Sequence, residues 1–148
     1  MEKSPKNYDV LIIGAGPAGA NAAISYKNLN SKLTVGLVDK AIFPRDKSCG
    51  DAIGPGVISA LKRFNNEHIL DGEPQVVSTT LYGPDNIGIQ NYIPEVKNKE
   101  DSIVYVIPRL DLDNRILNLA KEIGVDVYEG HSFVDFESNL DKSLTVQI

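Results

Sequence analysis

The sequence lacks features that would mark a secreted, membrane-spanning or nucleic-acid-binding protein. Its 148 residues include one cysteine, Cys49, so no disulfide can form within the chain, which fits a reducing compartment. The apolar run from Val10 to Ile13 ends at Gly14 and is too short for a signal peptide or a spanning helix. A formal net charge of -5 disfavours a general nucleic-acid binder. We therefore expect a cytoplasmic protein without a nucleic-acid partner, and peripheral contact with a membrane stays open.

Metal-ligand spacing, internal repeats and low-complexity tracts are also missing. His68 and His131 have no partners at ligand spacing, so we expect no metal site and treat both as structural or exposed residues. A hydrophobic fraction of 42% with 24% charged residues is enough to build a folded core. A length of 148 residues is normally one domain.

The first forty residues predict a strand, a tight turn, a helix and a second strand. Tyr8 to Ile13 and Leu33 to Val38 are apolar runs without alternation, as buried parallel strands are. Ala18 to Leu29 is alanine-rich and predicts a helix, and Pro17 precedes it where proline costs least. This order is typical of a βαβ unit, so the expected fold class is α/β with a Rossmann-like parallel sheet.

The rest of the chain predicts a loop, a β-rich segment, and then a helix followed by strands. Asp111 is the expected N-cap of a helix that runs to Ile123 and is stopped by Gly124. The other expected elements are a loop (Ala41 to Pro55), a helix (Val57 to Phe64), a hairpin or meander (Gln75 to Tyr82 and Ile87 to Ile93), a turn (Asn98 to Asp101), and four further strands (Ile103 to Ile107, Val125 to Tyr128, Phe133 to Phe136 and Leu144 to Ile148).

A glycine motif lies between the first strand and the first helix. The stretch Gly14-Ala15-Gly16-Pro17-Ala18-Gly19 fits G-x-G-x-x-G, and Asp39 follows at the end of the second strand. These glycines permit a tight turn, a close approach of a pyrophosphate and close packing of the helix on the sheet. Asp39 can accept hydrogen bonds from both ribose hydroxyls and would repel a 2′-phosphate, which disfavours NADP at this site. The motif predicts a dinucleotide site and leaves FAD and NAD as alternatives.

Two later stretches resemble the geranylgeranyl reductase family of flavoproteins, within the group that includes p-hydroxybenzoate hydroxylase and the flavin-dependent halogenases. The first is R-x-K-x-C-G, matched by Arg45, Lys47, Cys49 and Gly50. The second is R-x-x-[FL]-D-x-x-[LI], matched by Arg109, Leu112, Asp113 and Ile116, with a Gly-Val-x-Val strand at 124–127. With the glycine motif, these are three elements in the family's order over nearly the whole chain.

The resemblance implies a bound FAD in an extended form. The glycine turn would hold its pyrophosphate, Asp39 its ribose, Cys49 and Gly50 would lie near the flavin, and the backbone at Phe133 would border the adenine. In the family, NADPH reduces the flavin, which then saturates double bonds in a prenyl or isoprenoid lipid. No catalytic residue is identified. The expected cofactor-binding residues are Gly14, Ala15, Gly16, Pro17, Ala18, Gly19, Asp39, Lys40, Arg45, Cys49, Gly50, Arg109 and Phe133.

The resemblance also implies that part of the family's chain is missing here. Its members are much longer, and an Asp-Gly element, a later Gly-Asp element and the C-terminal substrate and membrane-facing region cannot be found. We expect residues 1–148 to be the N-terminal part of an FAD-binding domain, with a βαβ unit (1–40), an inserted β-rich segment (74–108) and a return to the domain (109–148). Weak FAD binding and little catalysis by this chain alone follow from that expectation.

Other interpretations stay open at this point. Arg45 and Lys47 could be solvated loop cations, Cys49 a small buried hydrophobe, Arg109 a partner of Asp111 or Asp113, and Asp113 a purely structural residue at the helix start. For the chain as a whole, the alternatives are a monooxygenase or halogenase of the same fold and a non-catalytic nucleotide-binding remnant. A dehydrogenase domain for NAD is disfavoured, because the strands between Gln75 and Ile93 interrupt its βαβαβ order.

Overall fold

The computed structural model describes residues 5–92 and 104–148, which form two compact units. The first unit comprises Met1–Lys47 and Arg109–Ile148, and the second comprises Ser48–Pro108. The second unit contains the predicted inserted segment 74–108. No helix in the described ranges is long and apolar enough to cross a membrane.

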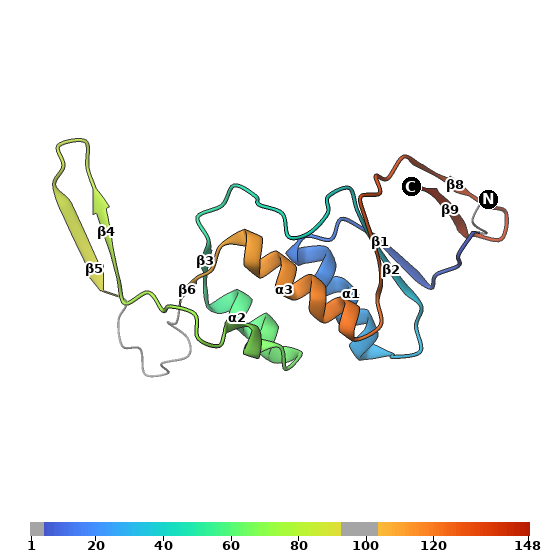
Figure 1. Ribbon diagram of the computed structural model, residues 1–148, viewed down its shortest axis with the longest axis horizontal. Helices are drawn as coiled ribbons and strands as arrows, with labels where there is room; N and C mark the ends of the chain where they lie inside the picture. Colours follow the sequence, from blue (N-terminus) through green and yellow to red (C-terminus); the bar gives the residue numbers. More distant parts are fainter. Residues whose placement is uncertain (1–4, 93–103) are drawn as a thin grey trace. The chain divides into compact units, whose positions relative to one another are not determined.

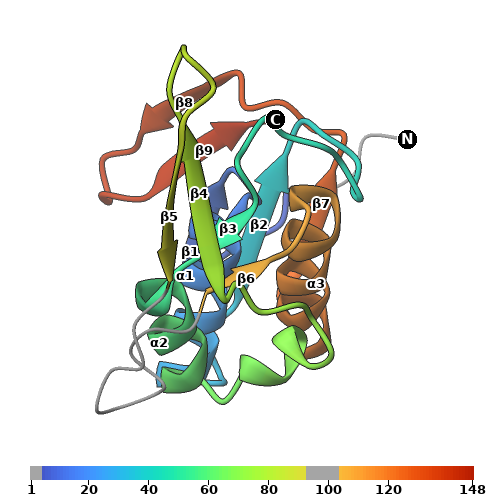
Figure 2. The ribbon, with the colours of Figure 1, turned by 90° about the vertical axis from the view of Figure 1, so that its left-hand side faces the viewer.

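The first unit is built on a parallel sheet of three strands in the order β1-β2-β7 (Figure 2). These strands are β1 (Val10–Ile13), β2 (Val35–Asp39) and β7 (Asp126–Glu129). The helices α1 (Pro17–Leu29) and α3 (Arg109–Glu122) lie side by side on one side of this sheet (Figure 1). The βαβ unit and the parallel sheet predicted from the sequence are therefore confirmed.

The core of the first unit forms where these helices meet the sheet. Ala20 and Ala23 of α1 are fully buried, and α1 packs against α3. Val35, Leu37 and Val38 of β2 are buried on both faces of the central strand, which explains why the sequence there shows no alternation. The apolar stripe of α3 is also buried, and it comprises Leu112, Ile116, Leu117 and Ala120.

An antiparallel hairpin of β8 (Asp135–Ser138) and β9 (Leu144–Gln147) lies on the other side of the sheet from the helices (Figure 1). Its residues are almost all exposed. The sequence predicted the first of these strands two residues early, at Phe133 to Phe136. The ladder begins only at Asp135, which pairs with Gln147, so Phe133 lies in the connection before it.

Several starts of elements in the first unit also differ from the prediction. The strands begin at Val10 and Val35 rather than at Tyr8 and Leu33, because Asp9 and Thr34 engage each other through their side chains at the entry to the sheet. Asp111 is not the N-cap of α3, since the helix already begins at Arg109. Pro108 directly precedes this helix and suits a helix start, where its fixed φ and missing N–H cost little.

The second unit has a small core of its own around a helix and a short strand pair. It contains β3 (Ala52–Ile53), α2 (Pro55–Arg63), a 3₁₀ turn η1 (Glu67–Leu70) and β6 (Tyr105–Val106), which pairs antiparallel with β3. The predicted loop from Ala41 to Pro55 is therefore too long, since it includes β3 and the start of α2. The buried side chains of this unit are those of Ile53, Ile58, Leu61, Ile69, Leu70 and Ile107.

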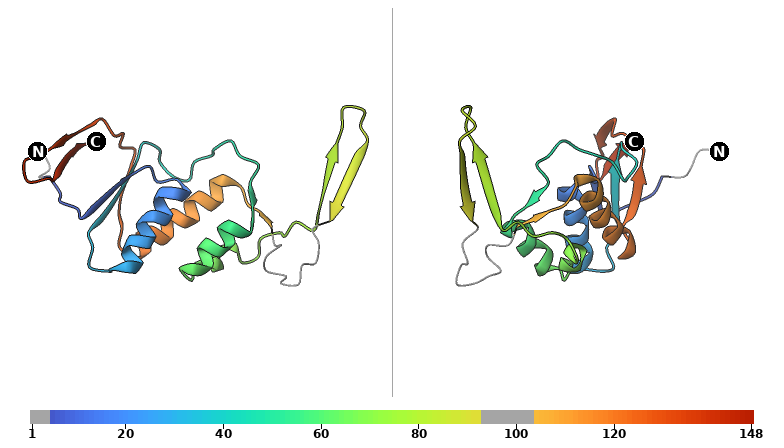
Figure 3. Two further views of the ribbon diagram at one scale, coloured as in Figure 1. Left: turned by 180° about the vertical axis from the view of Figure 1, so that it is seen from behind. Right: turned by 60° about the vertical axis from the view of Figure 1, so that its left-hand side comes forward.

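The second unit also carries an exposed hairpin. Its strands are β4 (Ser78–Tyr82) and β5 (Gly88–Tyr92), and Figure 3 shows them joined at the tip. They pair from Ser78 opposite Tyr92 to Tyr82 opposite Gly88, which confirms the predicted hairpin. The predicted turn at 98–101 and the first residue of the predicted strand at 103–107 lie outside the described residues.

Candidate nucleotide-binding site

The glycine turn between β1 and α1 is tight because a helix and a strand approach each other with no side chain between them. Gly14 has a φ of +101°, a region that L side chains rarely adopt, and its N–H donates to the carbonyl of Val38 at 2.7 Å. A Cβ on Gly19 would lie 1.8 Å from the carbonyl oxygen of Gly14. Gly19 is therefore required for the close approach, and the role predicted for it has a direct geometric basis.

The N-terminus of α1 carries no internal cap. Pro17 begins the helix, the N-cap residue Gly16 makes no side-chain capping hydrogen bond, and the first turn holds no acidic residue. The first-turn N–H groups of a helix have no intrahelical acceptor, and the helix dipole adds partial positive charge there. An anion such as a diphosphate would accept hydrogen bonds from these N–H groups and would be attracted by the partial positive charge, which fits the prediction made from the glycine motif.

Asp39 lies beside this turn, at the carboxyl end of β2. Its Oδ2 accepts a hydrogen bond from the N–H of Ala15 at 2.7 Å, and its Oδ1 accepts one from Ala41 at 2.8 Å. The sequence predicted a ribose contact for this carboxylate but not its contact with the turn. Asp39 fixes the glycine turn to the end of β2, and each oxygen keeps further lone-pair capacity for a ribose hydroxyl.

Arg45 lies next to the glycine turn and is linked to Arg109 through the buried carboxylate of Asp113. Arg109 donates from Nε to Oδ1 of Asp113 at 2.6 Å and from Nη2 to Oδ2 at 2.8 Å. The Nη1 atom of Arg45 forms an ion pair with Oδ2 of Asp113 at 3.4 Å. A Cβ on Gly16 would lie 3.4 Å from Nη2 of Arg45. The R-x-K-x-C-G stretch, the R-x-x-L-D stretch and the glycine motif thus contribute to one cluster.

This cluster decides between interpretations that the sequence left open. Arg109 pairs with Asp113, and Asp113 is fully buried. The Arg45 side chain is 21% exposed and lies over the ring of Phe43, 4.9 Å from its centroid. The interpretation of Arg45 as a solvated loop cation is therefore wrong, because its guanidinium is held by a carboxylate and an aromatic face. Lys47, in contrast, is exposed.

The loop that carries Arg45 is anchored to the edge strand β7. Glu129 accepts a hydrogen bond from the N–H of Phe43 at 2.7 Å through Oε1, and an ion pair from Lys121 at 2.9 Å through Oε2. Partial burial opposes the charged form of Glu129, but the bonds from Lys121 and Phe43 prevail and lower its pKa. Sequence reasoning missed Glu129, because it is 86 residues from Phe43 and matches no motif.

The remaining predicted site residues differ in their placement. Ala15 is buried in the turn, whereas Lys40 is exposed next to Asp39. Phe133 is 43% exposed in the connection before β8. Cys49 and Gly50 belong to the second unit, where both are exposed. The cofactor contacts expected for these residues stay predictions.

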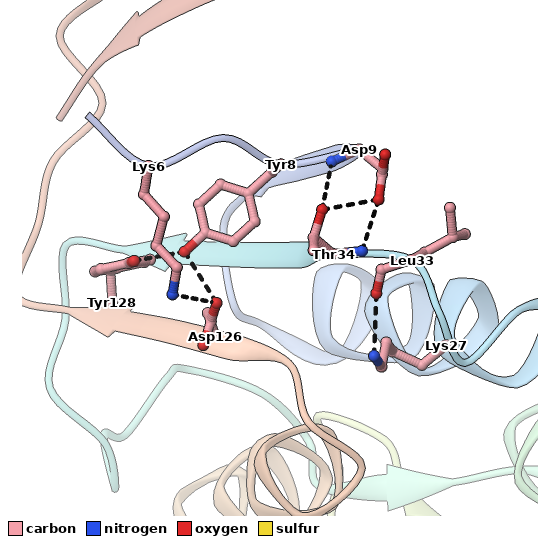
Figure 4. A network of polar contacts seen from close by, with 8 residues as sticks. All are labelled: Lys6, Tyr8, Asp9, Lys27, Leu33, Thr34, Asp126 and Tyr128. Atoms are coloured by element: carbon pink, nitrogen blue, oxygen red, sulfur yellow. Dashed lines mark hydrogen bonds and ion pairs between the residues drawn. The ribbon is translucent and has the colours of Figure 1, made fainter. Parts of the chain in front are cut away.

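A second polar network links the segment before β1 to β7 (Figure 4). Lys6 and Tyr8 both donate to Oδ2 of Asp126, and the hydroxyl of Tyr8 also bonds that of Tyr128. The bond from Lys6 is the main reason why the pKa of Asp126 is lowered. This network ties the segment before β1 to β7 and was not signalled by any sequence motif.

Comparisons with known proteins agree with this geometry. No protein-family model matches the chain. A menaquinone reductase of Mycolicibacterium smegmatis is 33% identical over 127 residues, which cover 86% of this chain and 30% of that protein. A digeranylgeranylglycerophospholipid reductase of Picrophilus torridus is 31% identical over 124 residues, covering 82% of this chain and 30% of that protein. The chain thus spans less than a third of the length of these curated relatives.

Solved structures show the same fold. The flavin-dependent halogenase CmlS superposes with a TM-score of 0.77 at 23% identity, over 95% of this chain and 26% of that one. A geranylgeranyl bacteriochlorophyll reductase-like protein from Thermoplasma acidophilum gives 0.71 at 23% identity, over 90% of this chain and 32% of that one. By sequence and by fold, this chain matches part of the geranylgeranyl reductase-like and halogenase-like flavoproteins of the p-hydroxybenzoate hydroxylase group, and it has their FAD-binding fold.

Proposed function

We propose that this chain binds the ADP half of FAD and is the nucleotide-binding part of an FAD-dependent oxidoreductase that resembles geranylgeranyl reductases. The observation that carries the proposal is that the uncapped N-terminus of α1 and the guanidinium of Arg45, which is fixed by Asp113, lie next to each other. Gly16 lies between the first turn of α1 and the guanidinium of Arg45, with space that a side chain would fill. This is a cradle for a diphosphate rather than for a neutral group.

The residues of the chain supply binding and orientation. The first-turn N–H groups of α1 and the guanidinium of Arg45 would hold the diphosphate, and Asp39 would orient the adenosine ribose through the free capacity of its oxygens. When bound, FAD would supply the hydride chemistry for reduction of a carbon–carbon double bond of a prenyl or isoprenoid lipid at the expense of NAD(P)H. We assign no proton donor to this chain.

A second candidate is a flavin-dependent halogenase or monooxygenase. It is favoured by the superposition on CmlS, which aligns as well as the reductase-like structure does. The two functions differ in what consumes the reduced flavin, which is an alkene in one case and oxygen in the other. The nucleotide site is common to both, so binding is tested first.

The test is an equilibrium titration of the purified 148-residue chain with FAD, followed by flavin absorbance and fluorescence, which also detects the weak binding expected of this chain alone. We expect Gly16→Val to weaken FAD binding at least tenfold, about 1.4 kcal/mol, because the added side chain meets Arg45 and fills the diphosphate position. Asp39→Ala should weaken it as well, since Ala15 loses its acceptor. Gly56→Val is the matched control, because a Cβ there has no neighbour within 4 Å.

The outcomes separate the possibilities clearly. Saturable FAD binding by the wild-type chain that is weakened in both site variants and unchanged in the Gly56 control supports the proposal. A wild-type chain that is folded by circular dichroism but shows no saturable FAD binding in the titration contradicts it.

A further inference from the structure

Asp113 is the one charged side chain that is fully buried within residues 5–92 and 104–148. It lies on α3 next to the buried Leu112 and within one turn of Ile116 and Leu117. Burial of a carboxylate in such surroundings is very unfavourable unless it is paired and hydrogen-bonded. The surroundings of Asp113 therefore have to supply cationic partners.

A single arginine already satisfies this requirement. Arg109 is one turn before Asp113 on the same helix and takes both carboxylate oxygens in a bidentate pair. The ion pair with Arg45 is thus additional, and it leaves two guanidinium groups around one carboxylate. The guanidinium of Arg45 also lies beside Gly16, the N-cap residue of α1.

The guanidinium of Arg45 is held on three sides. Asp113 contacts it through Nη1, the ring of Phe43 lies beneath it, and Gly16 lies next to Nη2. Phe43 is itself fixed by the hydrogen bond from its N–H to Glu129. An arginine on a loop normally loses conformational entropy when it binds an anion. Here the side chain of Arg45 is already ordered when the protein folds, so binding of an anion would cost less entropy.

We propose that Asp113 is a positioning residue for the cofactor diphosphate. It draws the guanidinium of Arg45 back to the glycine turn in the free protein, so that one cationic group faces the diphosphate before the cofactor arrives. The proposal rests on the FAD-binding function proposed above and adds a role that the sequence motifs do not state. Asp113 acts through Arg45 and makes no contact with the cofactor in this scheme.

Charge and geometry predict opposite effects for one isosteric change. Asp113→Asn removes a negative charge near the diphosphate, so charge alone would make FAD bind more tightly. Loss of the ion pair releases Arg45, so a positioning role makes FAD bind more weakly. The sign of the change therefore separates the two explanations.

The experiment is a titration of the 148-residue chain with FAD, ADP and adenosine. We expect Asp113→Asn to weaken FAD and ADP at least fivefold and to leave adenosine within twofold. In an Arg45→Ala background, the same change should cost less than twofold further, because the group that it positions is gone. Asp111→Asn is the matched control, since Asp111 lies on the same helix and is exposed.

A second measurement does not depend on the folding of the Asp113 variant. The guanidinium Nη resonances of Arg45 in the free wild-type chain should be sharp and slow to exchange with water, because Asp113 holds Nη1. Comparison with the spectrum of Arg45→Lys assigns them. If the Arg45 signal has the chemical shift and fast exchange of solvated arginines, the proposal is overturned.

Three results of the titration overturn the inference in different ways. A wild-type chain that binds neither FAD nor ADP removes the proposed function and this inference with it. Wild-type binding with equal or tighter binding by Asp113→Asn removes the inference alone. An equal loss for adenosine and ADP indicates general damage to the fold and also removes it.

Discussion

Strand β2 and the hairpin β4–β5 have similar lengths but opposite environments. Four of the five residues of β2 are buried, whereas every residue of β5 and four of the five in β4 are exposed. Leu37 is fully buried in β2, and the cross-strand pair Leu81 and Ile89 is 67% and 65% exposed. The presence of apolar residues in a strand therefore does not show by itself whether that strand contributes to the stability of the protein.

The difference has a physical cause in the connections. β2 lies between β1 and β7 with helices on one face, so its side chains are covered by long-range neighbours. The hairpin is held by its own ladder and by the turn at Asn86, which has a positive φ. Isolated two-stranded hairpins are marginally stable in water. Mutations should therefore be costly around β2 and nearly neutral in the hairpin.

The largest effect is expected at the glycine that allows the helix to approach the sheet. Gly19→Ala places a Cβ 1.8 Å from the backbone oxygen of Gly14, which cannot move without opening the turn. We expect a loss of about 3 kcal/mol or more in the free energy of unfolding, measured by urea denaturation. Gly56→Ala, in open space on α2, should leave stability equal or slightly higher. Equal stability of the two variants would contradict the geometry of the turn.

A smaller effect tests the two strands directly. Leu37→Ala leaves a cavity in the core and should cost about 2 to 4 kcal/mol, while Leu81→Ala should stay within about 0.5 kcal/mol. Urea denaturation measures both, and amide hydrogen exchange should show slow exchange in β2 and fast exchange in β4. A loss above 1 kcal/mol for Leu81→Ala would mean that the hairpin is covered in solution.

The same contrast explains what could be predicted from the sequence. The βαβ unit was predictable because glycine spacing, an apolar run and a terminal carboxylate are all local signals between Tyr8 and Asp39. The pairing of Arg109 with Asp113 could be anticipated because the two residues are four positions apart at the start of a predicted helix, although Asp111 remained an alternative partner. The contact of Arg45 with Asp113 joins two recognised motifs, but neither motif indicates that these residues pair. The contact of Phe43 with Glu129 was not predictable, because it joins distant segments and Glu129 matches no motif.

The smallest effect is expected from the anchor of the Arg45 loop. The folded-state pKa of Glu129 is lowered, so its stabilising contribution is present above its unfolded pKa of about 4.3 and is lost as the pH falls through the folded value. Glu129→Gln should cost up to about 1 kcal/mol at pH 7 and flatten the stability profile below pH 5. Unfolding curves between pH 3 and 7 measure this.

The control for Glu129 comes from an exposed hairpin. Glu137→Gln, on the exposed strand β8, should leave stability at pH 7 unchanged. If both glutamates behave alike, the negative charge of Glu129 and its ion pair with Lys121 do not contribute to stability.

The 86-residue separation between Phe43 and Glu129 has a consequence for the order of events during synthesis. Strands β1 and β2 are close in sequence, so they can pair while the second unit is still being made. The cluster of Arg45 and Asp113 can form only after α3 and β7 have left the ribosome and closed a long loop. A state in which β1 and β2 are paired but β7 and the contact of Arg45 with Asp113 have not yet formed therefore precedes the folded state. A nucleotide present at that stage would favour the late step by mass action and so act as a template for the last part of the fold.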